Sequence, residues 1–142
     1  MSNTIIVGMA DYKIGRTPDK LMTAGLGSCI GVCIYDLHEG AAGLAHIMLP
    51  SSNGNHAGNP AKYADTCLEM MLEDLCKLGL RKSRLKAKMA GGAQMFSFKG
   101  QTPQLKIGER NAEAVERELK STEFRFWQPM SAVLSGGLLI LI

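Results

Sequence analysis

Cys29 and His46 are the two residues whose types and surroundings point most directly to chemistry. Cys29 ends a stretch in which two glycines allow the backbone to turn sharply. A thiol acts as a nucleophile when a base takes its proton and when backbone N–H groups face the developing oxyanion. We expect Cys29 to be the nucleophile and His46 its base, with the turn at Gly27, Ser28 and Ile30 supplying those N–H groups. Taken alone, a cysteine is more often a small buried apolar residue and a histidine a satisfied strand residue.

A β-hairpin is the element expected to position this pair. Residues 29–35 and 42–48 have the composition of strands, and a polar stretch separates them. Facing residues in an antiparallel pair have numbers with a constant sum, and side chains alternate between the two faces. A two-residue turn gives a sum of 75 and sets Cys29 opposite His46. A four-residue turn gives 77 and sets Cys29 opposite Met48, with His46 diagonal to it. Both alternatives keep the thiol and the imidazole on one face.

The composition is that of one soluble globular domain. Apolar residues make up 46% of the 142 residues, which can bury a single sizeable core. A net charge of +3 is too small to favour nucleic acid. The basic cluster at 81–88 is interpreted as a solvated loop and an exposed strand face, with an acidic partner as the alternative. We recognise no signal peptide, no apolar run near the ~20 residues of a membrane helix and no C-x-x-C pair. We therefore expect a cytoplasmic chain with free thiols and with no metal or cofactor.

The remaining pattern alternates strands with two helices, which indicates a layered α/β or α+β domain. Strands are expected at residues 4–9, 21–23, 84–89 and 123–127, and loops at 13–20, 51–58 and 94–106. Residues 133–142 are a last apolar segment that Gly136 and Gly137 divide. Asn59-Pro60 predicts the start of a helix that ends at Gly79. Its apolar face is expected to be Ala64, Leu68, Met71, Leu75 and Leu78. Asn111 is the predicted N-cap of a second helix over 112–120, with Val115 and Leu119 facing inward.

Five short motifs occur in a fixed order between about Ile5 and Lys120. They are Thr23-x-Gly25-Leu26-Gly27-Ser28-Cys29, Ala45-His46-x-Met48-Leu49-Pro50, Lys62-Tyr63-Ala64-Asp65, Gly91-Gly92-Ala93-x-Met95-Phe96 and Ile107-Gly108-x-Arg110-Asn111. Together they resemble the CheD chemoreceptor glutamine deamidases of bacterial and archaeal chemotaxis. The resemblance implies an α/β layered sandwich of mixed β-sheets flanked by two or three helices, related to cysteine-dependent deamidating toxins. It implies a catalytic triad of Cys29, His46 and Thr23.

The same resemblance implies the partners: methyl-accepting chemotaxis receptors as substrate and the CheC phosphatase. Residues 1–142 are expected to form one such domain. From about residue 121 the sequence departs from the family pattern, because the expected Asp-x-Gly-Gly-x-x-x-Arg segment and Thr-Gly turn are missing. Met95 and Phe96 have two equally weighted interpretations, either a plug in the core or an exposed apolar contact for the partner.

The expected reaction is thiol-catalysed deamidation of a receptor glutamine to glutamate. His46 takes the proton of Cys29, with a standing thiolate–imidazolium pair as one form of that transfer. The thiolate attacks the amide carbon, ammonia leaves, and water hydrolyses the thioester. Two alternatives stay open: a non-catalytic adaptor that binds CheC or receptors, and a thiol hydrolase or transglutaminase that acts on another amide.

Overall fold

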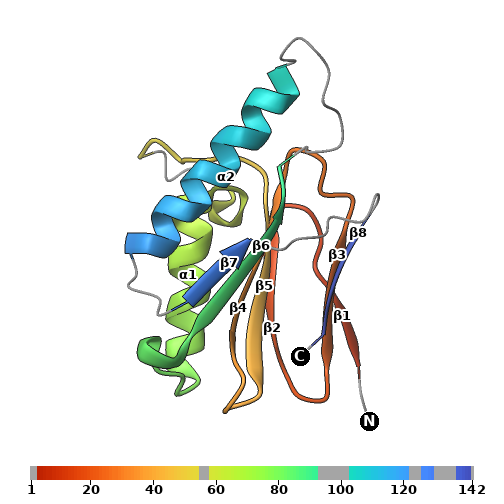
Figure 1. The fold of residues 1–142 in the computed structure, drawn as a ribbon, viewed down its shortest axis with the longest axis vertical. Coiled ribbons are helices and arrows are strands. Elements are labelled where there is room, and N and C mark those ends of the chain that lie inside the picture. The colour runs from red at the N-terminus through yellow and green to blue at the C-terminus, as the bar shows by residue number, and fades with distance from the viewer. Residues whose placement is uncertain (1–2, 55–57, 93–102, 122–125, 130–136, 142) are drawn as a thin grey trace.

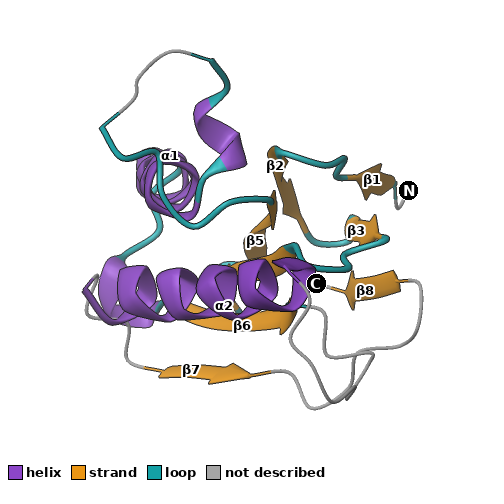
Figure 2. Cartoon of the chain, turned by 90° about the horizontal axis from the view of Figure 1, so that it is seen from above, coloured by secondary structure: helices purple, strands orange, loops and turns teal. Residues whose placement is uncertain are grey.

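The computed structural model of the protein describes residues 3–54, 58–92, 103–121, 126–129 and 137–141 (Figure 1). These residues form three layers: two helices, a five-stranded sheet and a three-stranded sheet (Figures 1 and 2). The strands are β1 Thr4–Ile6, β2 Asp11–Arg16, β3 Lys20–Ala24, β4 Ile30–Asp36, β5 Ala41–Ile47, β6 Lys86–Gly91, β7 Phe126–Pro129 and β8 Gly137–Leu141. The helices are α1 Ala64–Lys77 and α2 Pro103–Ser121, with 3₁₀ turns at Pro60–Lys62 and Lys82–Arg84. The predicted layered α/β class is confirmed.

Both sheets mix parallel and antiparallel pairs. The five-stranded sheet has the order β2-β5-β4-β6-β7, and only its β6–β7 pair is parallel. The three-stranded sheet has the order β1-β3-β8, with β1 parallel and β8 antiparallel to β3. The helices cover one face of the five-stranded sheet, and the three-stranded sheet lies on the other (Figure 2). The central strands are therefore buried on both faces.

Alternation along β4 sorts its side chains between two separate cores. Ile30, Val32 and Ile34 pack into the cluster that includes the residues of α1 and α2. Cys33 lies in the second cluster, between the sheets, together with Leu44 of β5. Because both faces need apolar side chains, β4 and β5 are near-continuous apolar runs. Full burial of each large aliphatic side chain stabilises the fold by roughly 1.5–3 kcal/mol.

Two strand glycines mark places where the layers approach closely. A Cβ at Gly15 in β2 would lie 3.3 Å from Ile5 Cδ1, which belongs to the neighbouring sheet. A Cβ at Gly43 in β5 would lie 2.7 Å from the Sδ atom of Met71 in α1. The absence of a side chain at these positions lets β2 approach the three-stranded sheet and lets β5 approach α1.

The helix predicted from Asn59 to Gly79 is interrupted near its start. Asn59 caps the short 3₁₀ turn by accepting the N–H of Ala61, but Tyr63 is extended, and α1 begins after it. The interruption allows Tyr63 to form a parallel bridge with Leu49, which follows β5. α1 ends at Lys77, and the expected inward position of Leu78 is wrong, since 44% of its surface is exposed. No helix within the described ranges has both the length and the apolar character needed to cross a membrane.

Several predicted boundaries are wrong. The strand expected at 4–9 ends at Ile6, and the one expected at 84–89 is Lys86–Gly91. Residues 13–20 are not a loop throughout, because β2 runs over Asp11–Arg16 as the edge strand beside β5. The second helix starts at Pro103 and not at residue 112, so residues 103–106 are helical and Asn111 lies in the helix interior. β7 overlaps the expected strand at 123–127, and β8 lies within the apolar segment at 133–142. Residues 94–102 lie outside the described part of the chain.

Candidate active site

Thr23 and His46 meet between the two sheets. Thr23 lies in β3 of the three-stranded sheet and His46 in β5 of the five-stranded sheet, and each is 1% exposed. The Oγ1 atom of Thr23 is 2.8 Å from the Nδ1 atom of His46 and donates a hydrogen bond of 2.8 Å to the Val7 carbonyl. A hydroxyl has one hydrogen and a carbonyl only accepts, so Nδ1 must be the donor to Oγ1. The neutral ring therefore carries its hydrogen on Nδ1 and a lone pair on Nε2.

The hairpin brings Cys29 to the same face as His46. Ile30 pairs with Ile47 and Gly31 with His46, so the facing residues sum to 77 and the four-residue turn is the one adopted. Cys29 directly precedes β4 and joins the buried cluster between the sheets, on the face that His46 presents to Thr23. Among the described residues, Nε2 of His46 is buried without a hydrogen-bond partner. The ring thus has a free lone pair in the layer that holds the thiol.

Two backbone hydrogen bonds fix the main chain at Cys29. Its N–H donates to the carbonyl of Leu26 at 2.7 Å, and its carbonyl accepts the N–H of Gly92 at 3.0 Å. Gly25 and Gly27 adopt φ of +65° and +51°, which favours glycine, so the predicted tight turn is confirmed. The thiol is consequently presented from a closed turn that is tied to the end of β6.

The expected oxyanion donors lie in different surroundings. Ile30 is fully buried at the start of β4, with β5 on one side and β6 on the other. The N–H of Cys29 already closes the turn onto Leu26. Gly27 and Ser28 lie in the turn outside the sheet, so their N–H groups are the candidates that a substrate oxygen can approach. The oxyanion role of Gly27, Ser28 and Ile30 stays a prediction.

Gly91 and Gly92 lie against the turn that carries Cys29, a contact that the sequence motif alone did not predict. A Cβ at Gly91, whose φ is +108°, would lie 2.2 Å from the Cys29 carbonyl oxygen. A Cβ at Gly108 of α2 would lie 2.4 Å from the carbonyl oxygen of Gly92. The end of β6 therefore contacts Cys29 backbone to backbone, and helix α2 contacts the end of β6 in the same way. Only glycine permits approaches this close.

Asn111 is the site residue whose position the sequence predicted wrongly. It is not an N-cap; it lies in the interior of α2 and is fully buried. Its Nδ2 atom donates to the carbonyls of Ser28 at 2.9 Å and Met48 at 2.8 Å. The family motif that ends in Asn111 was the available signal of a role at the site. Asparagine is a preferred N-cap residue, and its place before a short apolar pattern favoured the interpretation as a helix cap.

Burial favours the neutral forms of both candidate catalytic groups. It raises the pKa of the Cys29 thiol above its ordinary value of 9.0 and lowers the pKa of His46 below its ordinary 6.5. Both directions disfavour a standing thiolate–imidazolium pair, which was one expected form of the proton transfer. Burial also raises the pKa of Cys33 and of Cys67 to about 12. All four cysteines are free thiols, as predicted.

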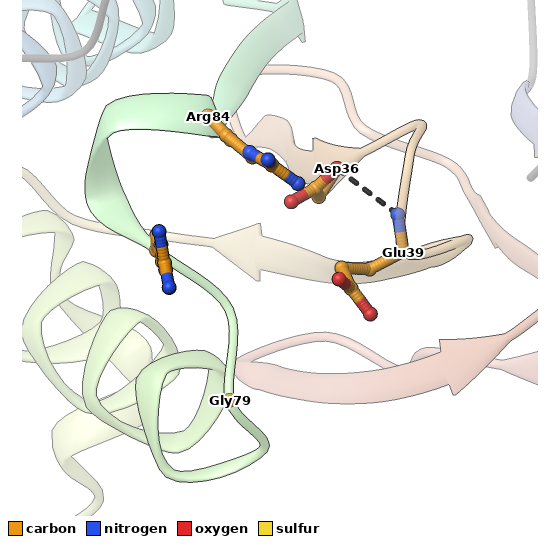
Figure 3. Close-up of a pocket in the computed structure, with 5 residues that line it drawn as sticks. Asp36, Glu39, Gly79 and Arg84 are labelled. Atoms are coloured by element: carbon orange, nitrogen blue, oxygen red, sulfur yellow. Dashed lines mark hydrogen bonds between the residues drawn. The ribbon is translucent and has the colours of Figure 1, made fainter.

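A cavity of about 310 Å³ lies away from this site, at the far end of β4 (Figure 3). It is lined by Asp36, Glu39, Gly79, Arg81 and Arg84. The Oδ1 atom of Asp36 accepts the N–H groups of His38 and Glu39, which closes the hairpin turn. The described residues contain no group of three or more His, Cys, Asp or Glu placed to hold a metal ion. Met95 and Phe96, expected to be either a plug in the core or a contact for the partner, lie outside the described residues.

Comparison with known proteins identifies the family. A sequence model described as CheD chemotactic sensory transduction matches residues 48–129. A probable chemoreceptor glutamine deamidase CheD of Desulfitobacterium hafniense (strain DSM 10664 / DCB-2) is 60% identical over 120 residues, covering 84% of this chain and 75% of that protein. One of Syntrophomonas wolfei is 54% identical over 121 residues, 84% of this chain and 75% of that protein. A chemoreceptor glutamine deamidase CheD of Bacillus licheniformis is 51% identical over 120 residues, 83% of this chain and 71% of that protein. The chain belongs to the CheD family.

Proposed function

We propose that this protein is a protein-glutamine deamidase that converts glutamine side chains of chemotaxis receptors to glutamate and releases ammonia. The observation that carries the proposal is the hydrogen bond of 2.8 Å between Thr23 and His46, on the face that Cys29 shares. Relatives at 51–60% identity are named chemoreceptor glutamine deamidases, which supplies the substrate class.

Cys29 is the nucleophile and His46 the general base. The substrate glutamine enters with its amide carbon beside the sulfur. As the S–C bond forms, the thiol proton passes to Nε2 of His46, which has no other partner among the described residues. The amide oxygen becomes an oxyanion and is held by N–H groups of the turn at Gly27 and Ser28. Loss of one such donor typically lowers the rate by ~10²–10³-fold.

His46 returns the proton in the second half of the reaction. The imidazolium protonates the amide nitrogen, the C–N bond breaks, and ammonia leaves a thioester on Cys29. Neutral His46 then takes a proton from water, whose oxygen attacks the thioester carbon. The C–S bond breaks, the sulfur recovers the proton, and the product is glutamate. Throughout, the Thr23 hydroxyl accepts the N–H of Nδ1, which holds the ring in the tautomer that the base needs.

The neutral resting state follows from burial. Because burial raises the pKa of Cys29 and lowers that of His46, the proton moves only when attack begins. Charge then develops where Thr23 and the turn already stabilise it, so little reorganisation is needed.

The partners that we propose are those that the family resemblance implies. The substrate is the cytoplasmic part of a methyl-accepting chemotaxis receptor, and the CheC phosphatase competes for the face that receives it. The protein then works in the cytoplasm. Conversion of glutamine to glutamate adds a negative charge to the receptor, and that charge shifts its signalling equilibrium.

The test is incubation of the pure protein with a receptor cytoplasmic fragment. Ammonia release and mass spectrometry of glutamine-containing peptides report the conversion of an amide to a carboxyl group. Cys29→Ala should abolish both signals. Cys33→Ala is the matched control, because Cys33 lies in the same buried cluster but outside the proposed chemistry, and it should keep them. Receptor binding without conversion would indicate an adaptor, and incorporation of an added amine would indicate a transglutaminase.

A further inference from the structure

We propose that Asn111 is a positioning residue for the reaction, because its side-chain amide ties the turn that carries Cys29 to the strand end that carries His46. This inference deepens the proposed function and rests on it for the roles of those two residues. It concerns how the two groups are held at a fixed separation.

The first link fixes the peptide unit of the nucleophile. Asn111 donates to the carbonyl of Ser28 at 2.9 Å, and this carbonyl belongs to the same peptide plane as the N–H of Cys29. That N–H donates to the carbonyl of Leu26 at 2.7 Å. The carbonyl and the N–H of this peptide unit are therefore both fixed by hydrogen bonds. The next plane is held as well, because Gly92 donates to the Cys29 carbonyl at 3.0 Å.

The second link fixes the strand end beyond the base. Asn111 also donates to the carbonyl of Met48, at 2.8 Å. The N–H of Met48 in turn donates to the Lys62 carbonyl at 3.0 Å, and the His46 carbonyl accepts the N–H of Ala10 at 3.0 Å. The segment from His46 to Met48 is thus held on several sides, and the side chain of Asn111 joins it to the thiol-bearing turn.

An amide suits this position for a geometric reason. The β4–β5 ladder ends at the pair Ile30 and Ile47, so the carbonyls of Ser28 and Met48 lie beyond its last pair. Buried carbonyls require donors, and one primary amide supplies two N–H groups in a single rigid plane. A carboxylate of the same shape supplies none. Asn111 therefore supplies the hydrogen bonds that the ladder lacks beyond its last pair. It sets the spacing of the two backbone segments that carry Cys29 and His46.

The helix that carries Asn111 is itself fixed against the site. Gly108 lies three residues earlier on the same face of α2, and its backbone touches that of Gly92 so closely that a Cβ would not fit. Asparagine is a poor residue for a helix interior. Its full burial there, with both N–H groups directed at the site, is explained by the tie and not by helix formation.

The test compares Asn111→Ala and Asn111→Asp with Val115→Ala. Val115 is a matched control, since it is fully buried on the same helix but faces the core on the helical side of the sheet. The readouts are thermal midpoint, the rate of Cys29 alkylation by iodoacetamide resolved by mass spectrometry, and kcat and KM for a receptor fragment. The alkylation rate needs no receptor, so it is independent of the proposed substrate.

The expected result is a loss of about 10- to 100-fold in kcat for both Asn111 variants, with KM changed by less than about threefold. Alkylation of Cys29 should also be slower in both variants. The rate in Asn111→Asp should be no higher than the rate in Asn111→Ala. Val115→Ala should lower the midpoint and leave both rates intact. Folded Asn111 variants with wild-type kcat and alkylation would overturn the inference. Failure of both variants to fold would also overturn it, because the residue would then be structural. If the wild-type protein alkylates at Cys29 but converts no receptor, the proposed function fails while the tie can still be judged.

Discussion

The hydroxyl of Thr23 and the imidazole of His46 are joined by a hydrogen bond of 2.8 Å that links one sheet to the other. Because the hydroxyl gives its hydrogen to Val7, it can only accept from the ring. A single contact with the carbonyl of Val7, which directly follows β1, therefore decides which ring nitrogen is free to act as the base. The tautomer is set where the two sheets pack together, by Thr23 and the Val7 carbonyl.

Replacement of Thr23 by valine should therefore impair the reaction. The variant keeps the shape of the side chain but leaves Nδ1 without its acceptor and the Val7 carbonyl without its donor. We expect kcat to fall by about 10- to 100-fold, as for other groups that orient a functional histidine. The free energy of unfolding should fall by about 1–3 kcal/mol, because two buried polar groups lose their partner. Steady-state kinetics and urea unfolding measure the two effects.

The matched control for this change is Thr23→Ser. Serine keeps the hydroxyl that both partners need and loses only a methyl group. It should retain most of the activity, with a kcat within a few fold of the original. Equal losses in Thr23→Val and Thr23→Ser would mean that the hydroxyl does not orient the ring.

The stability of the fold should depend on His46 at acid pH. Burial lowers the pKa of this ring in the folded chain below its ordinary 6.5. As the pH falls below about 6.5, the unfolded chain takes up a proton that the folded chain resists. The contribution of His46 is therefore present above pH 6.5 and is lost as the pH falls through the folded-state pKa. Urea unfolding from about pH 7 to about pH 5 should show a steeper loss for the wild type than for His46→Gln.

Reactivity of Cys29 should rise with pH without an early plateau. Burial raises the pKa of this thiol above 9.0, so the thiolate fraction is small at neutral pH. Alkylation by iodoacetamide, followed at the Cys29 peptide by mass spectrometry, should keep accelerating from about pH 6 to about pH 9. A rate that is already constant near neutral pH would indicate the standing ion pair instead.

Gly91→Ala should damage both the fold and the site. The new Cβ would meet the Cys29 carbonyl oxygen at 2.2 Å, and a φ of +108° is unfavourable for alanine. We expect a loss of more than about 2 kcal/mol in the free energy of unfolding and slower alkylation of Cys29. Gly8→Ala is the control, because nothing lies within 4 Å of its Cβ. It should change stability by less than about 0.5 kcal/mol.

The shared face of Cys29 and His46 could be predicted because it depends on local rules. Strand alternation and a short turn leave two registers, and both put the residues on one face. The structure adopts the register in which Gly31 faces His46. The contact between Thr23 and His46 followed only from the family resemblance. It joins two sheets, and alternation within a strand does not say which strands stack on which.

Two features that the sequence pattern does not predict, strand β2 and the position of Asn111, depend on tertiary contacts. The edge strand β2 contains Gly15 and lies shortly before Pro18, a pattern typical of a loop. Glycine fits at position 15 because Leu21 of the other sheet already fills the space beside it. Leu21 lies 3.4 Å from where a Cβ would be. Asn111 looked like a helix cap because asparagine is a preferred cap residue. Its amide is instead used by two carbonyls far away in the sequence, which no local pattern encodes.

A search for the thioester on Cys29 is the decisive experiment. The protein is mixed with a receptor fragment, quenched in acid during turnover, digested and analysed by mass spectrometry. We expect a receptor peptide joined through its former glutamine amide carbon to the sulfur of Cys29, and no adduct in Cys29→Ala. Deamidation that continues in Cys29→Ala, without an adduct at Cys29 in the wild type, would contradict it.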